Sequence, residues 1–352
     1  VLIIDDTVEE KRGKKIEGSC DYLFSNSKKK KVRGLNIVSL NYSDPHSSFM
    51  LDFAIAFSKH LRIHPGQFTQ KIHHATHAHK RRMEGAETKL TLALEMVKRS
   101  LKQGIVADCL LMDSWYAKPS FLQDVLAEGL HAIARLPQSD CIWHFKGKHK
   151  TLGRIYAALS SPKKLGHYGK VRYTYRSTIL EHGKLGRVKV VFIKTRERLI
   201  PILSTDTEMN DEAIIETYKK RWNIEQGYKE LRQYFGLGKE EGRLYETLIA
   251  RITLSMFSHN LLSYINRIEH EPRTLGGLFR EMECELQALA ISMDQFIQIL
   301  SDLAKISAIS ERNRDLERII NILRAHVRTE MGLGCGNIAS CQDACQSIPD
   351  AA

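Results

Sequence analysis

The stretch that decides the fold is ADCLLMDSWY, residues 107–116. Its first six residues are a short, mostly apolar run of the kind that forms a buried strand, and the run ends at Asp113. The segment VLIID at 1–5 reaches the acidic pair Asp5-Asp6 in the same way. A carboxylate at the end of a buried strand has a fixed position, so two such strands side by side place two carboxylates near one point.

The patterns around these two segments predict an α/β domain. Alternation and helical spacing indicate strands at 35–42, 49–57 and 131–136 and helices at 84–103 and 118–128. The polar stretch up to Lys31 predicts a loop. Strand, two strands, helix, strand, helix, strand is the order of a ribonuclease-H-like core. We therefore predict a ribonuclease-H-like mixed sheet with flanking helices, interrupted by a β-rich insertion and followed by a helical C-terminal region.

Composition divides the chain into five predicted parts. These are 1–140, the first part of the ribonuclease-H-like core; 141–205, a basic β-rich insertion; 206–240, the core's final helix; 241–330, a helical region; and 331–352, a loose tail. Segments rich in β-branched and aromatic residues at 171–180 and 188–195 indicate the insertion. A single helix is predicted over 210–235.

Positive charge is concentrated in the insertion. The chain carries +12, and residues 143–200 hold 15 Lys/Arg against two acids, so this stretch alone carries +13 and the remainder is close to neutral. Binding of a polyanion requires a surface whose charges are all positive, whereas solubility does not require charges of a single sign. We expect this module to contact nucleic acid and to be continuous with the acidic site.

Other compositional features exclude whole classes of protein. No apolar run of 18 or more residues is present, which excludes a transmembrane helix. The seven cysteines include no CxxC and are odd in number, so a disulfide framework is not expected and a reducing cytoplasm fits best. The chain begins at Val1 inside an apolar run, and we expect an N-terminal region to be missing.

The strand-end carboxylates suggest a metal site. Asp6 and Asp113 each stand where an apolar strand gives way to polar residues. Like charges held close together are unfavourable unless a cation joins them, and oxygen ligands suit Mg²⁺ or Mn²⁺. A strand-end Asp can equally cap the turn that follows it, so either position taken alone leaves both interpretations open.

A third carboxylate lies in YKKRWNIEQGYKELR, residues 218–232. Tyr218, Arg221, Glu225 and Arg232 recur at helical steps, which predicts one stripe on one helix. Residue types alone also fit a solvated ion-pair face. Beside two strand-end carboxylates, however, such a helix would complete a metal site and bind a phosphate next to it.

These four residues match Y-x2-R-x3-E-x6-[K/R], and the chain here resembles the insertion-sequence-4 family of DDE transposases. Asp6-Thr7 resembles the D-T element of that family's first strand, and Asp113 resembles its second strand-end Asp. The β-rich insertion is a further feature of the family. The resemblance covers roughly residues 1–260. The chain departs from the pattern at Arg232, where the family usually has Lys, and lacks the family's N-terminal DNA-binding region.

The resemblance implies a role for each matched residue. Its metal ligands and catalytic residues would be Asp6, Asp113 and Glu225, holding two Mg²⁺ or Mn²⁺ ions. Its DNA-phosphate-binding residues would be Tyr218, Arg221 and Arg232. Asp5 directly precedes Asp6, and a shift of one residue would exchange them. The match to the D-T pair favours Asp6.

The implied activity is cleavage and strand transfer at the ends of an insertion sequence, dependent on metal ions. Partners would be double-stranded DNA, from transposon ends and target, and a second copy in a DNA-bound dimer, with no membrane. The location would be the nucleoid of a bacterial or archaeal cytoplasm. Two alternatives remain open: an inactive transposase-derived DNA-binding protein, and another ribonuclease-H-like nuclease such as a resolvase, against which the Tyr-Arg-Glu helix argues.

Two further features of the sequence, Trp222 and a cluster of histidines, each have a simpler explanation. Trp222 is expected to pack its helix against the core, with stacking on a base as the alternative. Six histidines crowd residues 60–79, which suggests zinc. No completing ligand set lies nearby and a basic run follows, so a basic surface segment near DNA is preferred.

Overall fold

The computed structural model describes residues 1–13, 15–25, 28–58, 76–137, 142–160, 164–168, 171–239, 242–269, 273–306 and 321. The chain divides into two units, Val1–Pro272 and Arg273–Ala352. The expected loose tail, 331–352, lies outside the described residues. None of the helices in the described ranges combines the length and apolar character that a membrane crossing requires.

The first unit is built on one mixed sheet, which has twelve strands within the described residues. The strands are β1 (Leu2–Glu10), β2 (Cys20–Ser25), β3 (Lys30–Ser43), β4 (Ser48–Ile55), β5 (Cys109–Met112), β6 (His131–Arg135), β7 (Ile142–Phe145), β8 (Lys148–Thr151), β9 (Lys164–Tyr168), β10 (Val171–His182), β11 (Gly186–Lys194) and β12 (Leu199–Ser204). Their order is β2-β3-β1-β5-β6-β12-β11-β10-β7-β8, with β4 paired to β3 and β9 to β10.

The central strands confirm the predicted ribonuclease-H-like fold. β1 pairs antiparallel with β3 and parallel with β5, and β5 pairs parallel with β6. β12 then joins β6, so the β-rich insertion extends the core sheet edge to edge. Insertion and core therefore share one continuous hydrogen-bonded framework, and the two faces of the sheet run from one into the other.

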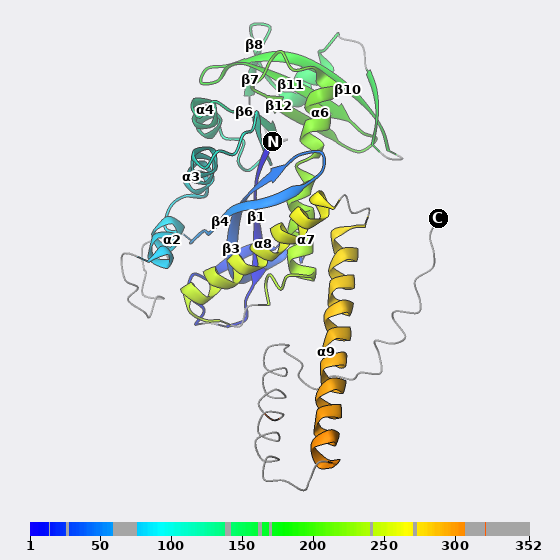
Figure 1. Ribbon diagram of the computed structural model, residues 1–352. Coiled ribbons are helices and arrows are strands. Elements are labelled where there is room, and N and C mark those ends of the chain that lie inside the picture. Colours follow the sequence, from blue (N-terminus) through cyan, green and yellow to red (C-terminus); the bar gives the residue numbers. More distant parts are fainter. Residues whose placement is uncertain are drawn as a thin grey trace. The chain divides into compact units, whose positions relative to one another are not determined.

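Helices cover both faces of this sheet (Figure 1). They are α2 (His77–Gly85), α3 (Lys89–Lys102), α4 (Pro119–Ala127), α5 (Leu152–Ala157), α6 (Asp211–Lys219), α7 (Trp222–Gln233) and α8 (Tyr245–Ile268); the second unit contains α9 (Leu275–Ile306). The helix predicted over 84–103 is confirmed as α3. It begins at Lys89 because the Thr88 side chain accepts a hydrogen bond from the Thr91 backbone N–H at 3.2 Å.

Strand alternation divides the core into two layers. On β1, Ile4 packs with one apolar cluster, which includes residues of α3 and α4, whereas Ile3 packs with the other, which includes residues of α6, α7 and α8. Neighbouring residues of a strand point to opposite faces. The same parity holds along the sheet, since Val190 of β11 belongs to the first cluster and Val191 to the second.

Three local predictions were wrong. β1 does not stop at the acidic pair but continues to Glu10, because its residues remain paired with β3 as far as Gly34. The loop predicted up to Lys31 contains β2 and the start of β3. The helix predicted over 210–235 is divided into α6 and α7 by a tight turn, in which the Arg221 N–H donates to the Tyr218 carbonyl at 3.0 Å.

A buried acid joins the strands to the first helices. Asp52 of β4 accepts from Arg81 of α2 and from Arg99 of α3, at 2.8 Å each, and both arginines also pair with Glu84. The Asp52 side chain is 9% exposed. The network therefore fixes α2 and α3 against the sheet. It thereby also fixes the surroundings of the face of β1 that α3 covers.

Candidate active site

Asp5 and Asp6 point to opposite faces of β1. The Asp5 carboxylate accepts from Arg221 Nη1 at 3.2 Å, on the face that α7 covers. The Asp6 carboxylate accepts from Lys89 Nζ at 2.7 Å and from the Tyr116 hydroxyl at 3.1 Å, on the face of α3. The alternation of a continuous strand requires this separation.

Arg221 joins two carboxylates that are far apart in sequence. Its guanidinium pairs with Asp5 on β1 and also with Glu225, one turn further along α7. Tyr228, another turn along, donates its hydroxyl to the Asp5 backbone carbonyl at 3.1 Å. The helix is thereby fixed against the strand at the position of the acidic pair.

Asp113 lies beside Asp5. Ile4 and Met112 are register partners in the parallel β1–β5 pair. The residues that follow them, Asp5 and Asp113, are therefore adjacent across the two strands. Asp113 Oδ1 accepts from the backbone N–H groups of Trp115 and Tyr116, at 2.8 and 3.3 Å. Asp113 therefore caps the turn that follows its strand, which confirms that alternative. These hydrogen bonds also fix its carboxylate next to Asp5.

Burial and repulsion give this cluster unusual electrostatics. Burial raises the pKa of Asp5 from 3.8 to about 7; Arg221 opposes the rise, and the nearby Asp113 and Asp6 add to it. Burial also raises the pKa of Tyr218 to about 12. For Arg221, burial acts to lower the pKa, but Tyr218, Glu225 and Asp5 outweigh it and the pKa is raised. The cluster is an anionic pocket with too little positive charge to hold Asp5 fully ionised at neutral pH.

Asp6 lies on the opposite face of β1 from Asp5, and its role as a metal ligand stays a prediction. Asp6 is held by Lys89 and Tyr116 on that face. Arg221 pairs instead with Asp5 and Glu225, and Asp113 is near enough to Asp5 to contribute to its raised pKa. The alternation of residues along β1 could have been read from the sequence: it places Ile3 and Asp5 on one face and Asp6 on the other. Only the position of α7 decides which of these two faces holds the site.

Arg232 fixes the far end of α7. Its guanidinium pairs with Glu9 at 2.6 Å and donates to the Thr7 hydroxyl, both on the Asp5 face of β1. The Glu9 side chain is 8% exposed, so this pair is largely shielded from water. Glu9 was not identified from the sequence, although its odd-numbered position on β1 matches that of Asp5. The phosphate role of Arg232 stays a prediction.

Two aromatic side chains stand at the turn between α6 and α7. Tyr218 lies in the last turn of α6, so it does not share a helix with Glu225 as predicted, although the tight turn keeps it next to Arg221. Trp222 is 58% exposed, and the preferred interpretation of it as a core residue is wrong. An exposed indole adjoining Arg221 is a surface on which a base could stack.

The carboxylate set fits a hard divalent cation by its chemistry. The donors are all oxygen, and two of them, Asp5 and Glu225, pair with Arg221. Within the described ranges, no three His, Cys, Asp or Glu side chains stand close enough together to hold one metal ion. Of the clustered histidines, His77 and His79 belong to α2, and the other four lie outside the described residues.

The charges of the insertion divide between the two faces of the sheet. Arg187 and Lys189 share the face of Val191, and hence that of Asp5, whereas Lys194 lies on the other. Lys189 is not free to meet DNA, because it pairs with Asp211 at 3.1 Å and donates to the Met209 carbonyl at 2.7 Å. The expectation of one uniformly positive surface is therefore too simple.

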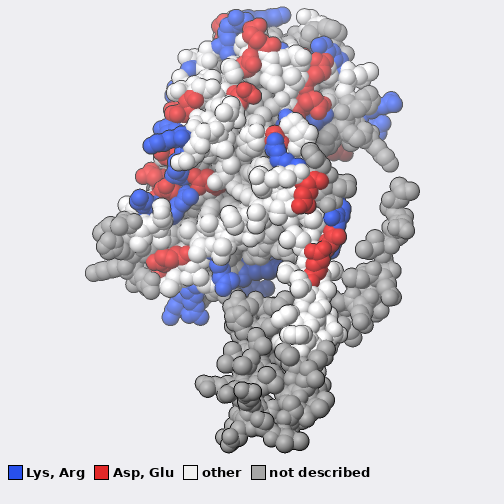
Figure 2. Space-filling model, in the orientation of Figure 1, with Lys and Arg blue, Asp and Glu red and all other residues white. Residues whose placement is uncertain are grey.

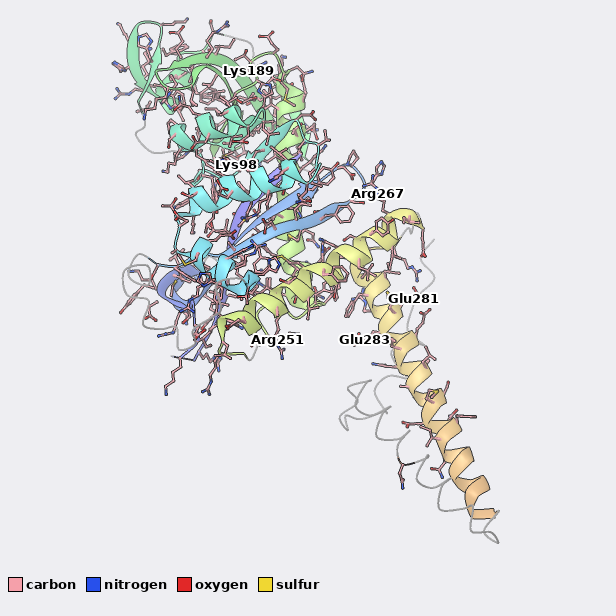
Figure 3. The ribbon with its side chains drawn as sticks, turned by 60° about the vertical axis from the view of Figure 1, so that its left-hand side comes forward. Lys98, Lys189, Arg251, Arg267, Glu281 and Glu283 are labelled. Atoms are coloured by element: carbon pink, nitrogen blue, oxygen red, sulfur yellow. The ribbon has the colours of Figure 1, made fainter. Side chains whose placement is uncertain are left out.

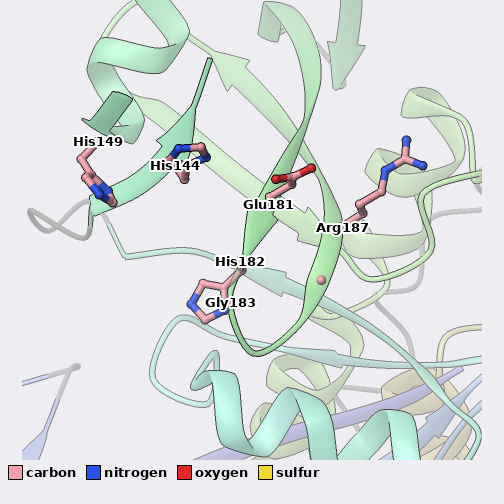
Figure 4. Close-up of a pocket in the computed structure, with 7 residues that line it drawn as sticks. His144, His149, Glu181, His182, Gly183 and Arg187 are labelled. Atoms are coloured by element: carbon pink, nitrogen blue, oxygen red, sulfur yellow. The ribbon is translucent and has the colours of Figure 1, made fainter. Parts of the chain in front are cut away.

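A hollow lies on the outer strands of the insertion (Figure 4). Arg187, Glu181, His144 and His149 are successive cross-strand partners on β11, β10, β7 and β8, so they form one row across the sheet. The rings of His144 and His149 are 5.7 Å apart and edge to face. The alternation of residues along the strands places this row on the face of the sheet that holds Asp5. The row lies at the β8 end of the sheet, whereas β1 lies near the β2 end.

Comparison with known proteins supports part of this interpretation. Residues 1–165 match the family model described as DDE superfamily endonuclease. The matched region contains β1 and β5, with both strand-end aspartates, and ends before α7. It supports a DDE-transposase-type domain with a nuclease-type function on DNA. A search of curated proteins found no match.

Proposed function

We propose that this chain is a transposase of the insertion-sequence-4 type, which cleaves DNA and transfers strands through Asp5, Asp113 and Glu225. One observation carries the proposal. Arg221 pairs with Glu225 and also with Asp5, which is 216 residues away in the chain and lies beside the strand-end Asp113. A purely structural ion pair would not need a third carboxylate, and the pKa of Asp5 is raised mainly by burial and further by Asp113.

The three carboxylates would hold two Mg²⁺ or Mn²⁺ ions. When bound, these ions would supply Lewis acidity and lower the pKa of an attacking oxygen. Asp5 and Asp113 are fixed by strand pairing and by the capped turn, and Glu225 stands on a helix held by Arg221 and Tyr228. The carboxylates are therefore preorganised by backbone structure.

Tyr218 and Arg221 would position a DNA phosphate next to the carboxylates. A guanidinium offers two parallel donors to phosphate oxygens, and the buried phenol keeps its proton as a further donor because its pKa is about 12. Trp222 would stack on an unpaired base beside this phosphate. Arg232, paired with Glu9, would position α7 rather than meet the DNA first.

The main alternative is a DNA-binding protein without catalysis. All three carboxylates and the Tyr-Arg-Glu sequence are present, which favours the enzyme. The two functions separate in one assay. The chain is incubated with supercoiled plasmid and with a short duplex carrying free 3′-hydroxyl ends, in Mg²⁺, in Mn²⁺ and in EDTA. Nicking and joined products that disappear in EDTA are expected. Binding without either product would favour the alternative, and nicking without joining would favour a simple nuclease.

A further inference from the structure

The hairpin formed by β2 and β3 carries a second concentration of positive charge. Residues 28–31 are four consecutive lysines at its turn, and all four are exposed. β2 is the end strand of the sheet on the side away from the insertion. Figure 2 shows Lys and Arg side chains gathered at the lower end of the first unit, the end towards which β1 runs in Figure 1. Figure 3 shows Lys189, on the insertion, at the opposite end.

Most of this charge is not neutralised by the protein itself. Lys28 pairs with Glu10, which lies on the neighbouring β1. Lys29, Lys30 and Lys31 form no ion pair with any described residue. The pKa of Glu10 is lowered, because Lys28 hydrogen-bonds to it and Lys30 adds positive charge. A surface of this kind attracts the phosphates of a polyanion.

Two exposed aromatic side chains stand beside these lysines. Tyr22 is 80% exposed and Phe24 is 58% exposed. Lys31 is the register partner of Phe24 across the hairpin, and its ammonium lies 5.9 Å from the centre of the Tyr22 ring. Tyr22, Phe24 and Lys31 therefore form one aromatic and basic patch, which we call the hairpin surface.

The backbone of Tyr22 has a conformation that aromatic residues rarely adopt. Its φ is 62°, in the left-handed region, and the register of β2 against β3 shifts between Cys20 and Leu23. Such a bulge redirects a side chain, here towards solvent at the edge of the sheet. Strain that is kept at a largely exposed ring favours a role in binding over a role in packing.

Protection of an edge strand is the simpler explanation for the lysines, since lysines at a sheet edge discourage pairing with other chains. It does not account for Tyr22 and Phe24, because apolar side chains at an exposed edge promote such pairing. Cations beside exposed rings are the combination that binds an unpaired nucleic-acid strand, whose phosphates meet the cations and whose bases stack on the rings. Bases within a duplex present only their edges in the grooves, so stacking selects an unpaired strand.

The hairpin surface lies on the face of the sheet that holds Asp5. Leu35 of β3 belongs to the same apolar cluster as Ile3, and alternation places Lys31 on that face as well. Asp5 pairs with Ser39, which is eight residues from Lys31 along β3, a distance of about 26 Å. A DNA strand that extends from the carboxylates could therefore reach the hairpin without crossing the sheet.

We propose that the hairpin surface binds an unpaired DNA strand beside the proposed active site. Bases stack on Tyr22 and Phe24, and Lys31 pairs with a phosphate between them. The identity of the strand as DNA rests on the proposed function, whereas the rings and the charge define the chemistry of the contact.

Binding measured without cleavage tests the stacking. Fluorescence anisotropy in EDTA compares a labelled oligothymidylate with a duplex of the same length. Tyr22→Ala and Phe24→Ala should each weaken binding of the single strand about tenfold, as expected for one stacked base, and leave duplex binding unchanged. Tyr264→Ala is the matched control, since Tyr264 is an exposed tyrosine on α8, and it should change neither affinity. A wild type that does not bind the single strand, hairpin variants that bind like the control, or equal losses for both probes would overturn the proposal.

Salt titration with the same oligothymidylate tests the phosphate contact. Lys31→Gln should reduce the slope of log affinity against log salt by about 0.7. Lys30→Gln removes the same charge from a residue that alternation places on the opposite face of β3, and it should change the slope less. Equal slopes for Lys31→Gln and wild type, or equal reductions for the two variants, would contradict a phosphate contact at Lys31.

Photo-cross-linking locates the strand on the wild-type chain. Oligothymidylate that contains 5-iododeoxyuridine is irradiated with the chain in EDTA, and the cross-linked peptide is identified by mass spectrometry. The peptide that contains Tyr22 and Phe24 is expected, and cross-links confined to other segments would overturn the proposal. A chain that nicks plasmid but cross-links elsewhere keeps the proposed function, whereas a chain that cross-links here without nicking loses that function alone.

Discussion

Asp5 and Asp6 are adjacent in the chain, yet Asp5 faces Arg221 and Glu225 whereas Asp6 faces Lys89 and Tyr116 on the other side of β1. The two carboxylates thus belong to different environments on opposite faces of the strand, with side chains 15% exposed for Asp5 and 20% exposed for Asp6. This relationship makes their substitution a direct test of the proposed site.

Asp5→Asn should abolish cleavage in Mg²⁺, whereas Asp6→Asn should retain it and lower the melting temperature. The first change removes a proposed metal ligand, and the second removes the charge that Lys89 and Tyr116 share. Plasmid nicking and thermal denaturation, measured on both variants, check this. Loss of nicking in Asp6→Asn with intact folding would restore Asp6 as the ligand.

Glu225→Gln should reduce nicking at least about 100-fold while leaving DNA affinity nearly unchanged, because it removes a metal-binding charge but not a phosphate contact. Glu216→Gln is the matched control, since Glu216 stands on α6 with its side chain 65% exposed. The measurements are nicking rate and a gel-shift titration. A Glu225→Gln chain that nicks as fast as the control would contradict the metal role.

Stability should fall as pH rises from about 4 to about 7, through the titration of Asp5. Its pKa is 3.8 in the unfolded chain and about 7 in the fold, so in this window the folded state holds a proton that the unfolded state has lost. The favourable contribution is complete below about pH 4 and is lost above about pH 7. Urea unfolding without metal, across this range, should show a shallower pH dependence for Asp5→Asn than for wild type or for the exposed control Glu95→Gln.

Arg187→Gln should weaken DNA binding and reduce the slope of log affinity against log salt by about 0.9. Arg187 is exposed on the face of the sheet that holds Asp5. Lys194→Gln, on the opposite face, should leave the slope unchanged. Salt titration of wild type and both variants distinguishes them. Equal slopes for wild type and Arg187→Gln would remove this face of the insertion from the DNA contact.

Asp52→Ala should destabilise the fold by about 2 kcal/mol, because it leaves Arg81 and Arg99 partly buried without their shared acid. Glu95→Ala removes an exposed pair with Lys98 and should cost less than about 0.5 kcal/mol. Chemical denaturation of both variants gives the comparison. A cost for Asp52→Ala no greater than that of the control would mean that Glu84 alone suffices for the two arginines.

Local patterns in the sequence determined much of the fold. The apolar runs ending near Asp5 and Asp113 predicted strands because burial of a short apolar segment between two layers leaves few alternatives. The spacing of Leu90, Leu94 and Leu101 predicted α3, since an amphipathic pattern fixes a helix whatever it packs against. The order of these elements predicted the ribonuclease-H-like sheet. In each case the signal lies within one segment and its periodicity.

Only the tertiary structure decided which of the two adjacent carboxylates pairs with Arg221. Alternation in the sequence states that Asp5 and Asp6 face opposite ways, but α7 begins more than 200 residues later, and its position selects the face. The break between α6 and α7 likewise follows no Gly or Pro, and it appears where Arg221 reaches two carboxylates at once. The exposure of Trp222 depends on that same turn. Contacts between distant segments are set by packing and charge in three dimensions, and no pattern within one segment records them.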